Sequence, residues 1–154
     1  DLNQIIEDIR LYIRNLRTAR EEQATFKQRL DNLARHFHDF ARVEVTVDVP
    51  PRLRTLNDQQ RHSLTQIVRE ALSNVARHAH ATHVLVKVRE KENTLVLTVE
   101  DNGVGCDPAE LRNPESFGLR NMDQRARQLS GQFSIDSDPE QGGTCITVQI
   151  PFRP

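Results

Sequence analysis

The chain has 154 residues with 21 basic and 22 acidic side chains, a formal net charge of −1, which argues against a general nucleic-acid binder. Apolar runs reach only three residues, as in Val84-Leu85-Val86, so neither a membrane span nor a secretory signal is expected within it. Two cysteines, Cys106 and Cys145, are too few for a disulfide framework, and a reducing cytoplasm is the expected compartment.

Two amphipathic helices are predicted before residue 42. The first has apolar residues in alternating steps of four and three, the seam of a coiled coil or helical bundle: Leu2, Ile6, Ile9, Ile13 and Leu16. The second has the same spacing: Phe26, Leu30, Leu33, Phe37 and Phe40. Either stripe can pack on the domain itself, but we expect the first to belong to a bundle whose partner is absent. Because this pattern begins at Asp1 rather than at a methionine, we interpret the chain as part of a longer protein, with room for a membrane segment upstream.

From Val43 the apolar period changes to two, which predicts a half-buried strand ended by Pro50-Pro51. Asn57, with Gln60 three residues later, predicts a capping box at the start of a helix that runs to about Ala79.

The remaining predicted elements are a hairpin (84–88 and 95–100), a loop (101–117), a helix from Gly118 closed by Gly131, and two strands (132–137 and 144–151). Paired strands separated by helices predict an α+β fold, a two-layer sandwich with helices on one face of a mixed sheet.

Glu70 and Asn74 lie four residues apart on the predicted helix and therefore share a face, which Arg77 and His78 continue. A carboxylate beside a carboxamide suits Mg²⁺, which prefers oxygen ligands, and Arg77 could then meet a phosphate. A solvated polar face explains the same pattern and is the better interpretation of this motif taken alone.

A second motif, Asp101-Asn102-Gly103-Val104-Gly105, directly follows an apolar strand. Asn102-Gly103 is a familiar turn pair, so a plain turn is the competing interpretation. It leaves Gly105 and the placement of the carboxylate unexplained. A fixed Asp101 could accept a hydrogen bond from an exocyclic amine, and Gly103 and Gly105 would let the backbone approach a planar ring.

Two further glycine motifs are weak when taken singly. Gly118 at a helix start leaves free N–H groups that can bind an anion, but an ordinary helix start explains it as well. Gly142-Gly143 before Thr144 is explained by a hairpin turn.

The order and spacing of all four motifs is specific. It runs Glu70-x-x-x-Asn74, then Asp101-x-Gly103-x-Gly105, then Gly118-Leu119, then Gly142-Gly143-Thr144 with Pro151 seven residues on. This order resembles the Bergerat ATP-binding fold shared by histidine kinases, type II topoisomerases, Hsp90 chaperones and MutL-type repair proteins. It is most similar to sensor histidine kinases of the nitrate/nitrite-sensor and degradation-sensor kind, through residues 69–79 and through Phe117-Gly118-Leu119 followed by Met122 and Arg125.

The resemblance implies catalytic roles for two residues at the phosphates of ATP. Asn74 would ligate a Mg²⁺ that bridges the phosphates, and Glu70 would hold the waters of that ion. Arg77 and His78 would lie near the phosphates. Gly118 and Leu119 would form the phosphate-side edge of a lid made by residues 106–117.

The same resemblance implies a base pocket built around one carboxylate. Asp101 would accept a hydrogen bond from the adenine amino group. Gly103, Gly105 and Thr144 would shape the pocket, and Gly143 belongs to the same nucleotide-binding motif.

The implied domains are residues 1–18 as the second helix of a dimerisation hairpin, 19–41 as a connecting helix and 42–154 as the catalytic domain. The implied enzyme is a histidine protein kinase whose catalytic domain lies in the cytoplasm. The full-length protein would form a homodimer through the dimerisation hairpin, with a response regulator receiver domain as its partner, and could be anchored at the inner face of the cell membrane. The family's phosphoacceptor His-Asp pair lies outside this chain, since His38-Asp39 stands just before the predicted strand at Val43. This chain alone is therefore not expected to phosphorylate itself.

Two alternatives share the same fold. A non-enzymatic nucleotide-binding regulator of the anti-sigma type would use the pocket as a switch, but it needs no dimerisation hairpin. A gated ATPase of the topoisomerase or repair type would use Glu70 to activate water, but the predicted lid of 12 residues is short for it.

Overall fold

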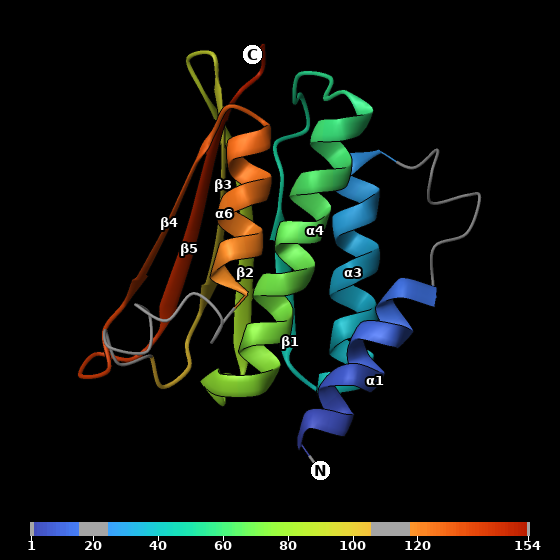
Figure 1. Cartoon of the computed structure of the whole chain (residues 1–154), viewed down its shortest axis with the longest axis vertical. Helices are drawn as coiled ribbons and strands as arrows, with labels where there is room; N and C mark the ends of the chain where they lie inside the picture. Colours follow the sequence, from blue (N-terminus) through green and yellow to red (C-terminus); the bar gives the residue numbers. More distant parts are fainter. Residues whose placement is uncertain (1, 16–24, 106–117, 154) are drawn as a thin grey trace.

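The computed structural model describes residues 2–15, 25–105 and 118–153. Its helices gather on one face of a single sheet (Figure 1). They are α1 (Leu2–Asn15), α3 (Phe26–Ala41), α4 (Asp58–Asn74) with the π-helix η1 (Val75–Ala79), and α6 (Leu119–Gln128). This arrangement confirms the predicted α+β two-layer fold.

The sheet has five strands in the order β1-β2-β3-β5-β4. They are β1 (Glu44–Asp48), β2 (His83–Lys91), β3 (Thr94–Asp101), β4 (Gln132–Ser137) and β5 (Thr144–Pro151). β1 pairs with β2 in parallel, and the other neighbours are antiparallel. The parallel pair is joined through α4, as a parallel connection requires a crossover. The sheet is therefore mixed, as predicted.

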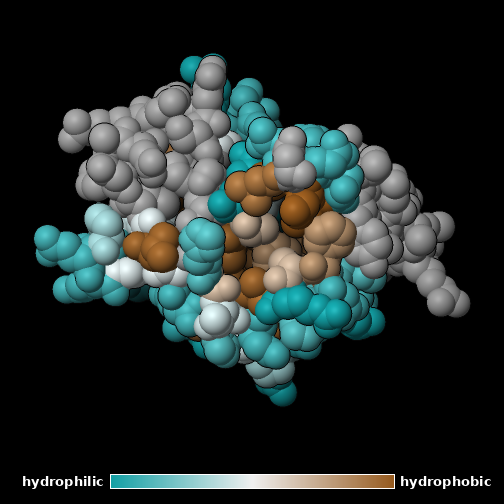
Figure 2. Space-filling model, turned by 90° about the horizontal axis from the view of Figure 1, so that it is seen from below, coloured by the Kyte–Doolittle hydropathy of each residue, from teal (hydrophilic) through white to brown (hydrophobic). Residues whose placement is uncertain are grey.

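Several element ends meet at one end of the molecule, the lower end in Figure 1. Here α4 ends, α6 begins, β3 ends, and the β4–β5 turn reverses the chain. Figure 2 views this end and shows an apolar area near its centre, surrounded by hydrophilic side chains. The predicted motifs fall on these element ends.

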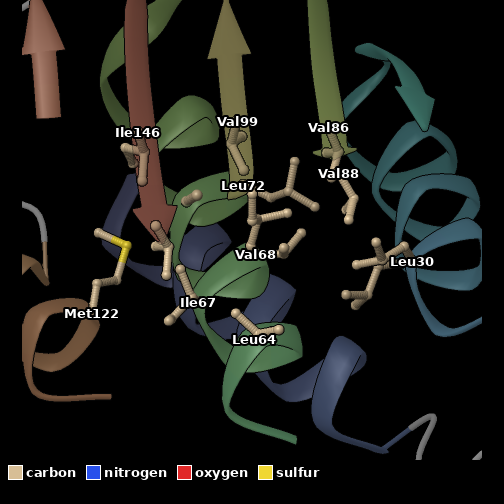
Figure 3. Packing of buried hydrophobic residues seen from close by; sticks show 14 of the residues in the cluster. Leu30, Leu64, Ile67, Val68, Leu72, Val86, Val88, Val99, Met122 and Ile146 are labelled. Carbon is tan, nitrogen blue, oxygen red and sulfur yellow. The ribbon is translucent and has the colours of Figure 1, made fainter. Parts of the chain in front are cut away.

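The core lies between the sheet and α4 (Figure 3). Alternate residues of the central strands, such as Val86 and Val99, face Ile67 and Leu72 of the helix, and all four are at most 3% exposed. Each such side chain contributes roughly 1.5–3 kcal/mol by leaving water. This layer holds α4, and hence Glu70 and Asn74, at a fixed place on the sheet.

The prediction for α4 is confirmed at the start of the helix and differs from the structure at its end. The capping box is confirmed, because the Gln60 N–H donates to Asn57 Oδ1 (2.7 Å) and the Asn57 N–H donates to Gln60 Oε1 (2.9 Å). At the other end the expected helix to Ala79 is α-helical only to Asn74, and residues 75–79 form a π-turn. Single π-turns of this kind often occur at functional sites.

Gly131 closes α6 for a different reason than expected. The left-handed residue after the helix is Ser130, with φ of 61°, while the Gly131 N–H donates to Ala126 O at 2.8 Å. A Cβ on Gly131 would lie 2.3 Å from Gln149 O of β5. Close packing on the sheet, and not backbone conformation, therefore requires this glycine.

The stripe of α1 is divided between the domain and solvent. Ile6 and Ile9 are buried, whereas Leu2 and Ile5 are 57% and 49% exposed. The last residue of the predicted seam, Leu16, lies outside the described residues. In the described parts of the chain, every helix is too short or too polar to cross a bilayer.

Candidate nucleotide-binding site

Asp101 is the last residue of β3 and is paired with Val84 of β2 and Thr144 of β5. The Gly103 N–H donates to its Oδ1 at 2.8 Å. Burial raises the pKa of Asp101, and the backbone N–H groups of Gly103 and Thr144 partly oppose that rise. The structure thus places a partly desolvated carboxylate at the end of a central strand, where it can accept a hydrogen bond from a ligand.

The glycines predicted around Asp101 bring three backbone segments into contact. The Gly143 N–H donates to Gly103 O at 2.7 Å, and the Gly142 N–H donates to Asp138 O at the same distance. Gly143 has φ of +84°, and a Cβ there would lie 2.8 Å from Asp101 O. A Cβ on Gly105 would likewise lie 2.8 Å from Asp138 O. The structure therefore brings Asp101, Gly103, Gly105 and Gly143 together.

Thr144 joins this group through a residue that the sequence analysis missed. Ser137 Oγ lies 2.8 Å from Thr144 Oγ1 and donates to Gly143 O at 3.1 Å. The signal was available, since Ser137 ends the strand that faces Thr144 across the predicted hairpin.

A hollow of about 270 Å³ opens beside these residues. Its lining includes Asp101, Gly143 and Thr144 from the predicted set and, in addition, Glu100, Asp136, Ser137, Asp138, Gln141, Gly142 and Cys145. Neither Glu70 nor Asn74 lines it. The hollow thus adjoins the predicted base-binding residues and does not reach the predicted phosphate-binding residues.

Glu70 and Asn74 form a second group, at the end of α4. Asn74 is only 8% exposed and Glu70 is half-buried. A Cβ on Gly118 would lie 2.2 Å from Glu70 Oε1, so the carboxylate lies directly against the residue that begins α6. A helix N-terminus favours negative charge, and α6 has no acidic residue of its own in its first turn. For Asn74, burial rules out the solvated-face interpretation.

The other predicted residues have mixed placements. Arg77 is half-buried in η1, and His78 belongs to η1 but its side chain lies outside the described residues. Leu119 is buried in the core, so only its backbone can face a ligand. The predicted lid, residues 106–117, lies outside the described residues.

Among the described residues, no group of three or more His, Cys, Asp or Glu side chains is arranged to hold a metal ion. One carboxylate and one carboxamide, Glu70 and Asn74, are the candidate oxygen ligands. Such a small donor set matches Mg²⁺ sites, in which waters and substrate phosphates complete the coordination.

Residues 59–154 match the family described as Histidine kinase-, DNA gyrase B-, and HSP90-like ATPase. Over 90 residues, 58% of this chain and 23% of the relative, the chain is 40% identical to the signal transduction histidine-protein kinase/phosphatase DegS of Brevibacillus brevis. Over 152 residues, 97% of this chain and 32% of the relative, it is 30% identical to the sensor histidine kinase MctS of Rhizobium johnstonii. The chain thus spans about a quarter to a third of these relatives.

The fold is similar to that of a solved histidine kinase domain, from a blue-light activated histidine kinase of Erythrobacter litoralis. The TM-score is 0.70 at 20% identity, over 83% of this chain and 61% of the solved one. The chain belongs to the histidine kinase-, DNA gyrase B- and HSP90-like ATPase family, as an ATP-binding domain of the sensor histidine kinase type.

Proposed function

We propose that this chain binds ATP with Mg²⁺ at the end where α4, β3 and α6 meet and transfers the γ-phosphoryl group to a histidine on a dimerisation hairpin. A response regulator receiver domain would then receive the phosphoryl group. The observation that carries the proposal is the buried Asn74 beside Glu70 on α4, at the same end of the molecule as Asp101 and its glycines. The similarity to sensor histidine kinases supports this class of reaction.

In this proposal the base is held by Asp101, which accepts a hydrogen bond from the adenine amino group. Side chains at Gly105 and Gly143 would collide with backbone oxygens, so these glycines let the backbone segments around Asp101 pack closely. With Gly103 they would also let this backbone lie close to the base. Thr144, with its hydroxyl against Ser137, closes the pocket on the β5 side.

The phosphates lie toward α4 and α6. Asn74 and Glu70 would hold Mg²⁺ and its waters, and the ion would supply charge neutralisation at the phosphates. The N–H groups at the start of α6, from Gly118 and Leu119, face the phosphate oxygens. Arg77 and His78 add charge and hydrogen-bond donors beside them.

The domain boundaries follow from the same proposal. Residues 1–18 are the second helix of a dimerisation hairpin, 19–41 connect it, and 42–154 are the catalytic domain. The exposed Leu2 and Ile5 are consistent with a helical partner in a homodimer. The catalytic domain works in the cytoplasm, with membrane anchoring left to other parts of the full-length protein.

The test uses the full-length protein that contains this chain, incubated with ATP labelled at the γ-phosphate. We expect label on the protein that is stable to alkali and lost in acid, as phosphohistidine is. Glu70→Gln should lower the amount of label on the protein at least a hundredfold, while the variant still binds ADP. Glu44→Gln makes the same chemical change at an exposed position of β1 and should leave labelling unchanged.

Three results would contradict the proposal. Phosphate release without labelled protein would indicate a gated ATPase. Nucleotide binding without either reaction would indicate a regulator that uses the pocket as a switch. No binding of ATP by the folded parent would remove the site itself.

A further inference from the structure

Asn102 makes four hydrogen bonds to two residues at the start of β2. The Thr82 and His83 N–H groups both donate to Asn102 Oδ1, at 2.9 and 3.0 Å. Asn102 Nδ2 donates to Thr82 Oγ1 at 2.9 Å, and the Asn102 N–H donates to His83 O at 3.2 Å. An exposed residue next to Asp101 is thus bonded at both its side chain and its backbone.

These bonds are not those of an ordinary turn residue. Asparagine is favoured in turns partly because it tolerates positive φ. In the described part of the chain, the non-glycine residues with positive φ are Arg42, His80, Glu92 and Ser130. Asn102 is not among them, so its backbone conformation does not require asparagine. Its side-chain hydrogen bonds do.

The bonds lie where the β2–β3 ladder ends. The last paired residues are Val84 and Asp101, and the Asn102 side chain continues the pairing by one step beyond them. The Glu44 N–H donates to Thr82 O at 2.9 Å, so the same segment is also tied to β1. The end of β3 is therefore held from the β1–β2 side by Asn102 and from the β5 side by Gly143.

We propose that Asn102 is a positioning residue that holds the Asp101 carboxylate at the place where it recognises the adenine amino group. Without the Asn102 side chain, the segment from Asp101 to Gly103 keeps its contacts to β5, the pairing of Asp101 with Val84 and the backbone bond to His83 O. It loses the three side-chain bonds to Thr82 and His83. The carboxylate then no longer has one position relative to the base. The inference rests on the proposed role of Asp101 and predicts that Asn102 governs the choice of base.

The experiment titrates this chain with ADP and with inosine diphosphate, in which an oxygen replaces the amino group. The parent should prefer ADP. Asn102→Leu should weaken ADP binding about tenfold and inosine diphosphate binding less than twofold, so that the preference collapses. Asn102→Asp keeps the oxygen that accepts from Thr82 and His83 and should retain most of the preference.

The matched control lies at the other end of the same hairpin. Asn93 Oδ1 accepts a hydrogen bond from Arg54 Nη1 at 3.0 Å, so Asn93→Leu also removes a side-chain brace. It should lower Tm without changing the ratio of the two affinities. If Asn102→Leu does not fold, Asn102→Ala serves for the same comparison.

The inference is overturned if the parent prefers ADP and Asn102→Leu, or Asn102→Ala in its place, weakens both nucleotides equally or neither. A parent that binds both nucleotides alike contradicts the role of Asp101, and with it the proposed function of the base pocket. The two failures are therefore distinguishable.

Discussion

The two ends of the β2–β3 hairpin are held by different kinds of contact. The turn of this hairpin lies at the upper end of the molecule in Figure 1. Side chains there contact one another. The Arg54 guanidinium lies 5.1 Å from the centroid of the Phe152 ring, and its Nε is 2.5 Å from Glu90 Oε1. Nη1 of the same arginine donates to Asn93 Oδ1. One arginine there links the hairpin, the loop before α4 and the end of β5.

At the lower end, bonds from side chains to backbone groups predominate, although Asn102 also binds the Thr82 hydroxyl. Asp101 accepts from the Gly103 N–H, Asn102 binds backbone groups of Thr82 and His83, and Gly143 packs against the Asp101 carbonyl. At the upper end a charged group is compensated by another side chain, which favours stability. At the lower end the carboxylate of Asp101 keeps acceptor capacity for a ligand, at some cost to the stability of the domain.

The largest expected effect comes from removing that carboxylate. Asp101→Asn should weaken ADP binding at least a hundredfold, about 3 kcal/mol, because an amide that presents its NH₂ group to the adenine amine leaves a buried donor unpaired. Calorimetric titration checks this. Asp123→Asn, on the exposed part of α6, is a matched control that should bind ADP normally. A variant at Asp101 that binds like the parent would contradict the comparison of the two ends.

The pH dependence of the unfolding free energy of Asp101→Asn tests whether the buried carboxylate lowers the stability of the domain. Burial raises the pKa of Asp101 in the folded state. Its contribution to stability is therefore fully present below the ordinary pKa of aspartate and is lost as pH rises through the raised value. The stability of Asp101→Asn relative to the parent should therefore increase as pH rises from 4 to 7. Urea unfolding across this range measures the difference, and a constant difference would contradict the cause.

A side chain at Gly143 should disturb the lower end next most strongly. Gly143→Ala places a Cβ 2.8 Å from Asp101 O at φ of +84°, which costs about 1–3 kcal/mol of unfolding free energy. We expect ADP affinity to fall about tenfold. Gly131→Ala, where a Cβ would meet Gln149 O, should destabilise the fold without lowering the ADP affinity of the folded protein. Equal loss of affinity in both variants would show that only stability is being measured.

The upper end predicts the opposite pattern. Arg54→Ala removes the ring contact, the ion pair with Glu90 and the bond to Asn93, and should lower the free energy of unfolding by about 1 kcal/mol. ADP affinity should stay within twofold of the parent. Arg54→Lys keeps the positive charge but not the planar guanidinium group, and it should recover about half of the lost unfolding free energy. A changed ADP affinity would show that the two ends are coupled.

The smallest effect concerns the thiol of Cys145. Burial raises its pKa, and the carboxylates of Glu100 and Asp136 raise it further, against a hydrogen bond with Thr147. In a Cys106→Ser background the thiol should react severalfold more slowly with a disulfide reagent at pH 7.5 than glutathione does. Asp136→Asn should speed the reaction about twofold. A Cys145 thiol that reacts as fast as glutathione would contradict a raised pKa at this position.

Most of the secondary-structure elements and the family could be predicted from the amino-acid sequence alone. Apolar periods of two and of three to four are local, and the Asn57–Gln60 capping box lies within four residues, so both could be predicted without a fold. The four glycine and carboxylate motifs were recognisable by their order along the chain. The β2–β3 hairpin was also predicted, although it is longer than the residues named for it, since polar strand ends carry little periodic signal.

The surroundings of each polar group could not be predicted from the sequence, because they depend on contacts between distant segments. The burial of Asn74 depends on elements packed around the end of α4, and the bonds of Asn102 join residues 19 and 20 positions apart. Gly131 looked like a helix terminator, but it is required by β5, whose Gln149 carbonyl leaves no room for a Cβ. The π-turn after Asn74 could not be predicted from the sequence either, because the same residues continue a helical pattern. For Asn102 and Gly131 the partner that explains the residue is distant along the chain, and a local pattern carries no information about such contacts.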